Sequence, residues 1–370
     1  MNTSTEIKQI NNVADYIDAV NSLIKNKKEP HRIFLYRGEP ELYEESSCIP
    51  SIFRRKDLSD NVYYEKSLYN AIKQNKLSKG DNYLETAIEA QHGEFPSRLL
   101  DVSYNSLIAL YFAVTPYYHK EVTAYDDKDG AVYVFYVDKL FSPSASNTVD
   151  NYDAIINKTT WLNQPIFAKT HKMIDHTKLN NRIIAQQGAF ILFQGNDAER
   201  IPQYMFDRIE IPYSAKKTIR EELVALFGLS KSFVFPEITN YVDDLSEKNK
   251  ILITEDFSID GEIESVFNTF SDELDYFSDF IVAFERKKHE RDFYNAIQKM
   301  EMIINSYKSS FEVFIEMVER NSEINNELKR YSIDAQKDRI DIIREYNRLL
   351  TVFIEELKVE GIEISESLKF

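Results

Sequence analysis

A short polar stretch holds the densest set of side chains in this sequence that could do chemistry. Residues 91–113 read QHGEFPSRLLDVSYNSLIALYFA, in which polar residues lead directly into an apolar run. Glutamine and histidine side chains both donate and accept hydrogen bonds, and histidine exchanges a proton near neutral pH. We therefore expect this stretch to mark the functional site through its polar members, Gln91, His92, Arg98, Asp101, Ser103 and Asn105.

The centre and the edges of this stretch have different expected roles. Two leucines separate Arg98 from Asp101 and anchor the centre in the core, so these two side chains are expected to form an internal ion pair. The edges are the better ligand candidates, with Gln91 and His92 on one side and Ser103 on the other. A purely structural role for the histidine remains open.

A second constellation, Tyr36-Arg37-Gly38-Glu39, follows a short apolar run that predicts a strand. An arginine next to a glycine at a strand end can present its guanidinium group while a ligand phosphate approaches the backbone closely. The alternative is an internal pair between the arginine and a carboxylate that fixes the loop. We expect Arg37 to face the 91–103 segment.

The sequence lacks the common catalytic templates. It contains no GxSxG, P-loop, GxGxxG or HExxH motif. The six histidines are scattered, and although His171 and His176 flank Asp175, no second donor pair accompanies them, so no metal is expected. Cys48 is expected to be a small buried residue.

Composition favours a soluble, cytoplasmic protein. The single cysteine fits a reducing compartment and excludes an internal disulfide framework. The N-terminal residues show no signal-peptide pattern, and no apolar run approaches the roughly 20 residues that span a bilayer, so no membrane partner is expected.

The net charge of −16 is concentrated near the C-terminus. Residues 237–370 contain 17 Lys and Arg against 31 Asp and Glu, which leaves residues 1–236 close to neutral. Such an acidic chain is poorly suited to sequence-independent nucleic-acid binding, which requires phosphate neutralisation. The basic run Arg54-Arg55-Lys56 could still form a local pocket for one nucleotide, or it could be a solvated face.

Hydrophobic periodicity predicts an α+β fold with a small, mainly antiparallel sheet and flanking helices over residues 1–245. Helices are predicted at 12–26, 63–77, 83–91, 107–114 and 214–227, and strands at 33–40, 130–137, 187–194 and 208–212.

From residue 261 the pattern changes to apolar residues spaced three and four apart, which predicts an all-α bundle or coiled-coil-like module in a second domain, 246–370. The three apolar series run through 267–284, 297–318 and 340–357, the last with Asn347 in the seam. This module is expected to serve domain packing or homo-oligomer formation, or alternatively to act as a sensing or partner-binding arm.

The polar motifs, taken together, resemble the FRG domain family. The family pattern is similar to QHYGxPTRLLDWTxNPLxALYFA, and this chain also has LYRGE before it and RIIAQQGAFILF and LFGLSKSFVFPEI after it. The chain departs from the pattern at Glu94-Phe95, Ser97, Val102, Ser103 and Ser106. The resemblance covers roughly residues 12–245 and implies an FRG-type domain, a family that does not by itself define a reaction.

The order of motifs is also similar to that of ADP-ribosyltransferases. That resemblance implies NAD as substrate, with Arg37 on an NAD phosphate, Ser103 near the nicotinamide ribose and Gln187 at the position of the usual catalytic glutamate. Because glutamine cannot replace a carboxylate, another acid would have to serve, the candidates being Glu39, Glu89 and Asp101.

Two functions are therefore expected. In the first, the chain is a nucleotide-handling effector, an ADP-ribosyltransferase-like toxin or phage-defence protein, that uses Arg37, His92, Ser103 and Gln187 and modifies a protein or nucleic-acid acceptor. In the second, it is a non-catalytic module that binds a nucleotide, another small molecule or a peptide and assembles through its helical tail. The binding residues are the same in both: Tyr36, Arg37, Gly38, Glu39, Gln91, Arg98 and Asp101. A scaffold, or a nuclease or hydrolase based on His92 and Asp101, is a further alternative.

Overall fold

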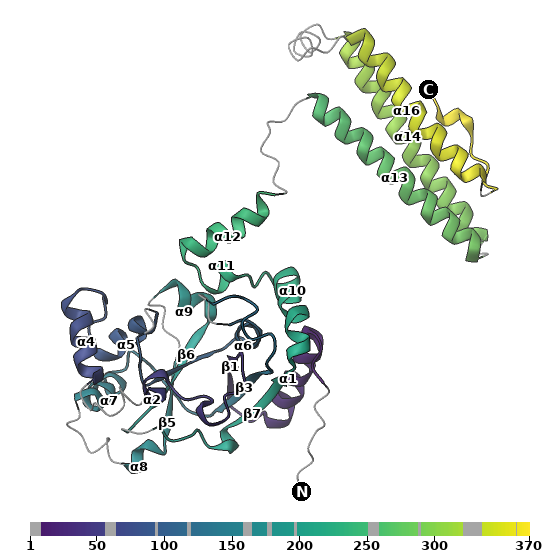
Figure 1. The fold of residues 1–370 in the computed structure, drawn as a ribbon. Coiled ribbons are helices and arrows are strands. Elements are labelled where there is room, and N and C mark those ends of the chain that lie inside the picture. The colour runs from purple at the N-terminus through teal and green to yellow at the C-terminus, as the bar shows by residue number, and fades with distance from the viewer. Residues whose placement is uncertain are drawn as a thin grey trace. The chain divides into compact units, whose positions relative to one another are not determined.

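The computed structural model describes residues 9–55, 64–92, 95–116, 120–157, 165–175, 180–195, 198–250, 259–287, 290–320, 335–359 and 361–370. The chain forms two compact units, Met1–Leu252 and Ile253–Phe370. The first unit contains the sheet and the second consists of helices, so the α+β class predicted from the sequence is confirmed (Figure 1). No helix in the described ranges is both long and apolar enough to cross a membrane.

A seven-stranded sheet organises the first unit, in the order β4-β5-β6-β2-β1-β3-β7. Its strands are β1 (Ile33–Glu39), β2 (Leu99–Ser103), β3 (Gly130–Val137), β4 (Leu140–Phe141), β5 (His171–Ile174), β6 (Gly188–Phe193) and β7 (Phe206–Ile211). All neighbours pair antiparallel except β4 with β5, so the predicted mainly antiparallel sheet is confirmed.

The seam between β1 and β2 is the weakest junction of the sheet. β1 pairs with β3 along its whole length, and β2 pairs with β6 along its whole length. Between β1 and β2, by contrast, the described structure has a single register pair, Tyr36 opposite Ser103. The two strands therefore separate beyond this point, which leaves their facing backbone groups to find other partners.

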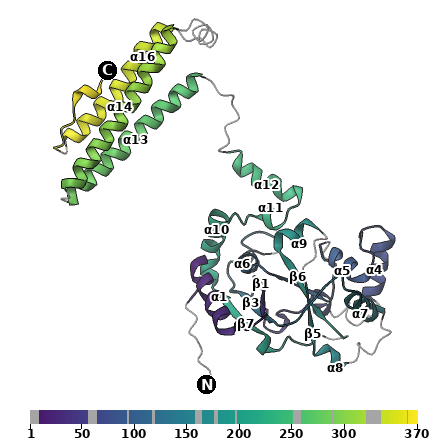
Figure 2. The same cartoon turned by 180° about the vertical axis from the view of Figure 1, so that it is seen from behind.

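Helices cover the sheet in two groups. The helices α1 (Val13–Lys27), α6 (Ser106–Val114) and α10 (Lys216–Phe227) pack with β1, β3 and β7. The helices α4 (Tyr64–Gln74), α5 (Tyr83–His92), α7 (Ser146–Asn157) and α9 (Asn181–Gln186) pack near β2, β5 and β6 (Figures 1 and 2). Shorter elements complete this unit: η1 (Glu44–Ser46), α2 (Ser51–Arg54), α8 (Pro165–Ala168), η3 (Gln203–Met205), η4 (Tyr213–Ala215), α11 (Lys231–Val234) and α12 (Ile238–Lys248).

The predicted helices and strands of this unit are present, but the strands β2, β4 and β5 and the helices α7, α9 and α12 were not predicted. The residues of β2, LLDVS, were expected to belong to the turn before the buried helix at 107–114. Four of the five side chains in β2 are buried, because apolar clusters cover both faces of the strand. A strand covered on both sides lacks the alternation that identifies half-buried strands in a sequence.

The second unit consists of α13 (Ile259–Lys287), α14 (Glu290–Arg320) and α16 (Ala335–Val359), followed by η5 (Glu366–Leu368). The described side chains of the predicted apolar series in the first two helices, including Phe270 and Ile304, pack in one core. In α16 the predicted seam position Asn347 is wrong by one residue, since the fully buried side chain is Tyr346. Its ring stacks on Phe270, and its hydroxyl donates to the carbonyls of Ile304 (3.3 Å) and Leu368 (3.2 Å).

Candidate functional site

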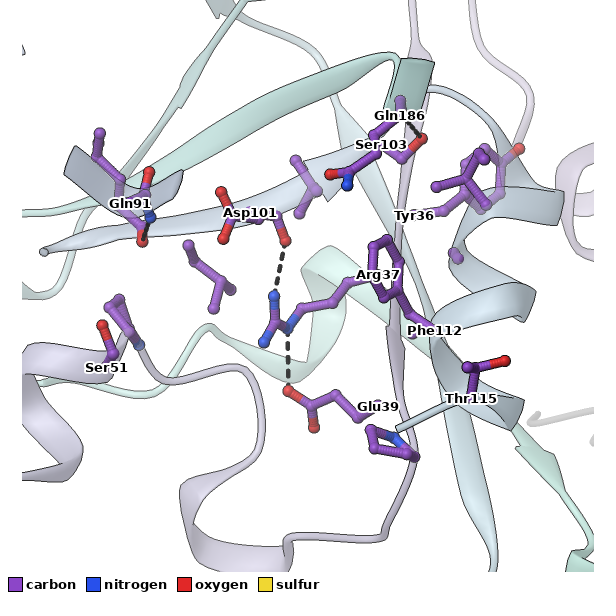
Figure 3. A pocket seen from close by; sticks show the side chains of 18 of the residues that line it. Tyr36, Arg37, Glu39, Ser51, Gln91, Asp101, Ser103, Phe112, Thr115 and Gln186 are labelled. Carbon is purple, nitrogen blue, oxygen red and sulfur yellow. Dashed lines mark hydrogen bonds and ion pairs between the residues drawn. The ribbon is translucent and has the colours of Figure 1, made fainter. Parts of the chain in front are cut away.

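A cavity of about 450 Å³ opens at the seam between β1 and β2 (Figure 3). Its walls come from the end of β1, from β2, and from α2, α5, α6 and α9. Such a volume lies in the range of roughly 300–1,000 Å³ that small-molecule sites occupy. The cavity is therefore a candidate for a ligand site among the described residues, and it contains Arg37, Gln91, Asp101 and Ser103, which the sequence had singled out.

Arg37 lies at the centre of this cavity. Its Nη1 donates to the carbonyl of Asp101 at 2.8 Å, and its Nε donates to Oε1 of Glu39 at 3.0 Å (Figure 3). The first bond replaces a ladder hydrogen bond that the separated strands no longer make. Burial lowers the pKa of Arg37, but the combined attraction of Glu39, Cys48 and Asp101 outweighs this, and the net pKa is raised. The structure thus brings Arg37 next to the 91–103 segment.

Glu39 is the internal partner of Arg37 and is already saturated. Its side chain is buried, and it also accepts hydrogen bonds from the amide of Cys48 (3.1 Å) and the hydroxyl of Ser47 (2.9 Å). Cys48 has a left-handed backbone (φ 55°), so these contacts fix an unusual turn. The arginine–carboxylate pair considered from the sequence is therefore present, and Glu39 has little capacity left for a ligand.

Gly38 is explained by the packing of a helix. A Cβ atom at this position would lie 1.8 Å from the carbonyl oxygen of Ala109 in α6. Only a glycine allows β1 and α6 to approach this closely. Gly38 lines the cavity, but its close contact with α6 already explains why this residue is a glycine. A bound ligand phosphate is not required to explain it.

Arg54, at the end of α2, differs from the other arginines at the site. It lines the cavity, and no hydrogen bond or ion pair joins it to any residue that the structure describes. The cavity walls and the charge of Arg37 lower its pKa. A bound anion would relieve the repulsion between these two guanidinium groups.

Asp101 contributes both its backbone and its side chain. Its carbonyl accepts from Arg37, while its carboxylate is exposed to the cavity and forms no ion pair with the described residues. The cavity walls raise the pKa of Asp101, and the nearby Arg37 and Arg182 oppose this rise. Among the predicted acids, Asp101 therefore has a carboxylate that remains available.

Arg98 lies away from this cavity, and the expected pair between Arg98 and Asp101 is absent. The buried Arg98 instead pairs with Glu65 of α4 through Nε (2.8 Å) and Nη2. Its Nη1 donates to the carbonyls of Phe193 (3.2 Å) and Gly195 (2.9 Å). Glu65 could not be recognised as the partner because it lies on a helix distant in the sequence.

The remaining predicted residues occupy different environments. Gln91 lines the cavity and donates from Nε2 to the carbonyl of Leu99 at 2.8 Å, while its buried Oε1 has no partner among the described residues. His92 is the last residue of α5, and its side chain lies outside the described part of the structure. Glu89 accepts hydrogen bonds from the amides of Lys79 (2.7 Å) and Gly80 (3.2 Å), away from the cavity.

Ser103 and Gln187 differ from the roles implied by the transferase resemblance. Ser103 lines the cavity, but it is buried and its hydroxyl donates to the carbonyl of Gln186 (2.6 Å) and accepts from the amide of Asn105 (2.9 Å). Gln187 is the left-handed C-cap of α9 (φ 49°), and its exposed side chain does not line the cavity. The preceding residue, Gln186, lines the cavity instead.

Sequence reasoning missed several residues of the cavity wall. Tyr43, Phe112, Lys120, Tyr125, Arg182, Gln186 and Phe235 all line it. Arg182 pairs with Glu237 and stacks over Phe235, at 5.2 Å from the ring centroid. A signal for some of them was present, because RIIAQQG and SFVFPE contain Arg182, Gln186 and Phe235.

Several residues, among them three of the six histidines and one residue of the basic run 54–56, lie outside the described structure. His119, His176, His289, Lys56 and Trp161 fall outside the described ranges. Within those ranges, no group of three or more His, Cys, Asp or Glu side chains is arranged to hold a metal ion.

Comparison with known proteins supports the domain assignment. The FRG domain model matches residues 32–121, which include β1, β2, α6 and most of the cavity wall. This match confirms the predicted FRG resemblance over that segment, whereas the later motifs, at 182–193 and 226–238, lie outside it. No curated protein and no solved structure matches the chain.

Proposed function

Since this chain contains an FRG domain, we propose that the cavity at the β1–β2 seam of that domain binds a nucleotide. The single observation that carries the proposal is Arg54, a guanidinium group without a partner among the described residues, placed beside Arg37 in a cavity wall. Arg37 is paired with Glu39, whereas Arg54 is a guanidinium group at this wall without an ion-pair partner among the described residues. Phosphate oxygens match the fork of donors that such a group presents.

The cavity also offers aromatic surface near this charge. Phe112 and Tyr36 lie on one side of the Arg37 guanidinium, and Asp101 and Gln91 lie on the other (Figure 3). Further aromatic side chains in the wall are Tyr43, Phe95, Tyr125 and Phe235. A charged centre with aromatic surface in the same wall suits a nucleotide, and we propose a dinucleotide, whose pyrophosphate joins two nucleosides. NAD is such a molecule.

A second candidate function is transfer of ADP-ribose from NAD, and the available carboxylate of Asp101 favours it. In such a reaction the bond between the nicotinamide nitrogen and ribose C1′ breaks, and its electron pair leaves with nicotinamide. An acceptor oxygen or nitrogen then bonds to C1′, and Asp101 would stabilise the positive ribose and take the acceptor's proton. A raised pKa suits that last step. A protein with this activity would serve as a toxin or phage-defence effector.

Binding is tested by calorimetric titration of the full chain with NAD, ADP-ribose and ATP, comparing wild type with Arg54→Ala. Loss of charge-assisted hydrogen bonds is expected to weaken binding roughly 10- to 100-fold. The matched control is Arg55→Ala, because Arg55 follows directly in the chain but does not line the cavity. Equal affinity for Arg54→Ala and wild type, or no binding by wild type, would refute the proposal.

The variant Asp101→Asn distinguishes ADP-ribose transfer from NAD binding. We expect this variant to bind NAD with wild-type affinity but to lose release of nicotinamide, measured by chromatography. If wild type binds NAD without releasing nicotinamide in the presence of cell extract, the non-catalytic binding module is the correct function.

A further inference from the structure

Lys216 is a buried cation in an unfavourable place. It is the first residue of α10, its side chain is fully buried, and no carboxylate among the described residues lies within ion-pair distance of it. A cation is also disfavoured at a helix N-terminus, where the helix dipole is positive. Burial lowers the pKa of Lys216 to about 8. A buried charge in such a place is stable only if other interactions offset these unfavourable effects, and those interactions define its role.

The contacts of Lys216 identify that role. Its Nζ donates to the carbonyl of Pro40 at 2.6 Å and to the carbonyl of Tyr125 at 2.7 Å. Pro40 follows β1 directly, whereas Tyr125 belongs to the loop before β3, and both residues line the cavity. The ammonium group therefore joins two segments that are far apart in the chain and close together at the cavity.

Other contacts join the same two segments, which we call the rim: residues 40–43 and 120–128. Burial and the neighbouring Tyr125 raise the pKa of Tyr43, and Lys128 pairs with Glu41 at 2.7 Å. Lys120, also in the cavity wall, donates to the Tyr125 hydroxyl at 2.6 Å. Lys128 and Glu41 are partly exposed, whereas Lys216 is the buried member of this set.

The nearby acids do not replace these carbonyls as partners of Lys216. Asp126 attracts the ammonium group but is already held by both terminal nitrogens of Arg220, at 2.7 and 2.5 Å. Arg220 also donates to the carbonyl of Val114, which anchors the loop to the end of α6. The loop is thus fixed to the helices on one side and, through Lys216, to the end of β1 on the other.

We propose that Lys216 is a positioning residue that holds the rim of the cavity, and that the rim, through Tyr43 and Tyr125, selects ligands that carry a ring. This proposal rests on nucleotide binding at the seam. Arg37 and Arg54 lie on β1 and α2 and would bind a small anion without the rim. The rim tyrosines add aromatic surface for a ligand that extends beyond its phosphates.

The test compares NAD with inorganic pyrophosphate as calorimetric probes, in wild type and Lys216→Met. Methionine keeps the length of the side chain and removes its donors. We expect about a tenfold loss of NAD affinity and less than a twofold change for pyrophosphate. Equal losses for both probes, or no loss for either, would overturn the proposal. The matched control is Lys217→Met, since Lys217 is largely exposed and lies outside the cavity wall.

Two further measurements keep the proposal testable if ligand binding or folding fails. Hydrogen exchange of residues 121–128 without ligand is expected to be at least tenfold faster in Lys216→Met, and unchanged exchange would contradict the positioning role even if no nucleotide binds. If Lys216→Met does not fold, Lys128→Ala breaks an exposed contact of the same rim. It is expected to weaken NAD binding about twofold while leaving pyrophosphate binding unchanged, and no effect on NAD would count against the rim.

Discussion

Two arginine sites in the FRG domain show how similar side chains acquire different roles. Arg98 lies in the core, where Glu65 and two backbone carbonyls satisfy its guanidinium group. Arg54 lines the seam cavity and has no such partner among the described residues. Arg37 is intermediate, because it is paired with Glu39 yet faces the cavity. The number of satisfied donors, more than the motif in which an arginine occurs, separates a structural from a ligand-binding candidate.

The largest expected effect belongs to the core site. Arg98→Ala would leave the buried Glu65 carboxylate without its partner, and removing one member of a buried pair costs about 3–5 kcal/mol of unfolding free energy. Urea denaturation followed by circular dichroism would measure this loss. A destabilisation below about 1 kcal/mol would mean that Arg98 is not the brace described above.

A smaller effect on stability is expected at Arg37. Arg37→Ala removes the partner of the Asp101 carbonyl and one partner of Glu39, but Glu39 keeps its bonds from Ser47 and Cys48. We expect a loss of about 1–3 kcal/mol in the same denaturation experiment, together with loss of nucleotide binding. Arg54→Ala is the comparison, with stability within about 0.5 kcal/mol of wild type. If Arg54→Ala proved less stable than Arg37→Ala, the distinction between a paired and an unpaired arginine at the cavity would be wrong.

The smallest expected effect is a dependence on pH at Lys216. Its folded-state pKa of about 8 lies below the ordinary value of 10.5, so between these pH values the unfolded chain holds a proton that the folded chain has released. The free energy of unfolding of wild type should therefore rise with pH across this window, by about 1–2 kcal/mol relative to Lys216→Met. The charged groups that act on Lys216 are Asp126, Asp127, Asp129 and Arg220.

Denaturation midpoints of both proteins at pH 7.5, 8.5, 9.5 and 10.5 would measure this difference. Titration of the buried tyrosines affects both proteins and cancels in the comparison. A constant difference across the series would show that Lys216 does not change its protonation in this range.

The two units differ in how much of their structure the sequence predicts. In α13 and α14 the repeat of apolar residues located the buried side chains, because a helix places residues three and four apart on one face. The error in α16 concerns one position, where Tyr346 replaces Asn347 in the core. A tyrosine hydroxyl that finds two backbone carbonyls can be buried, and local spacing does not reveal those partners.

In the first unit, the sequence determined the types of the predicted helices and strands (though not β2), the polar stretch at 91–105 and the nearness of Arg37 to it. Only the tertiary structure decided that Arg98 pairs with Glu65, that Ser103 is saturated, and that Arg54 and Asp101 remain available at the cavity. The physical reason is that a side chain's role depends on which of its polar atoms already have partners. Those partners come from segments far away in the chain, brought together by a sheet that separates at its β1–β2 seam.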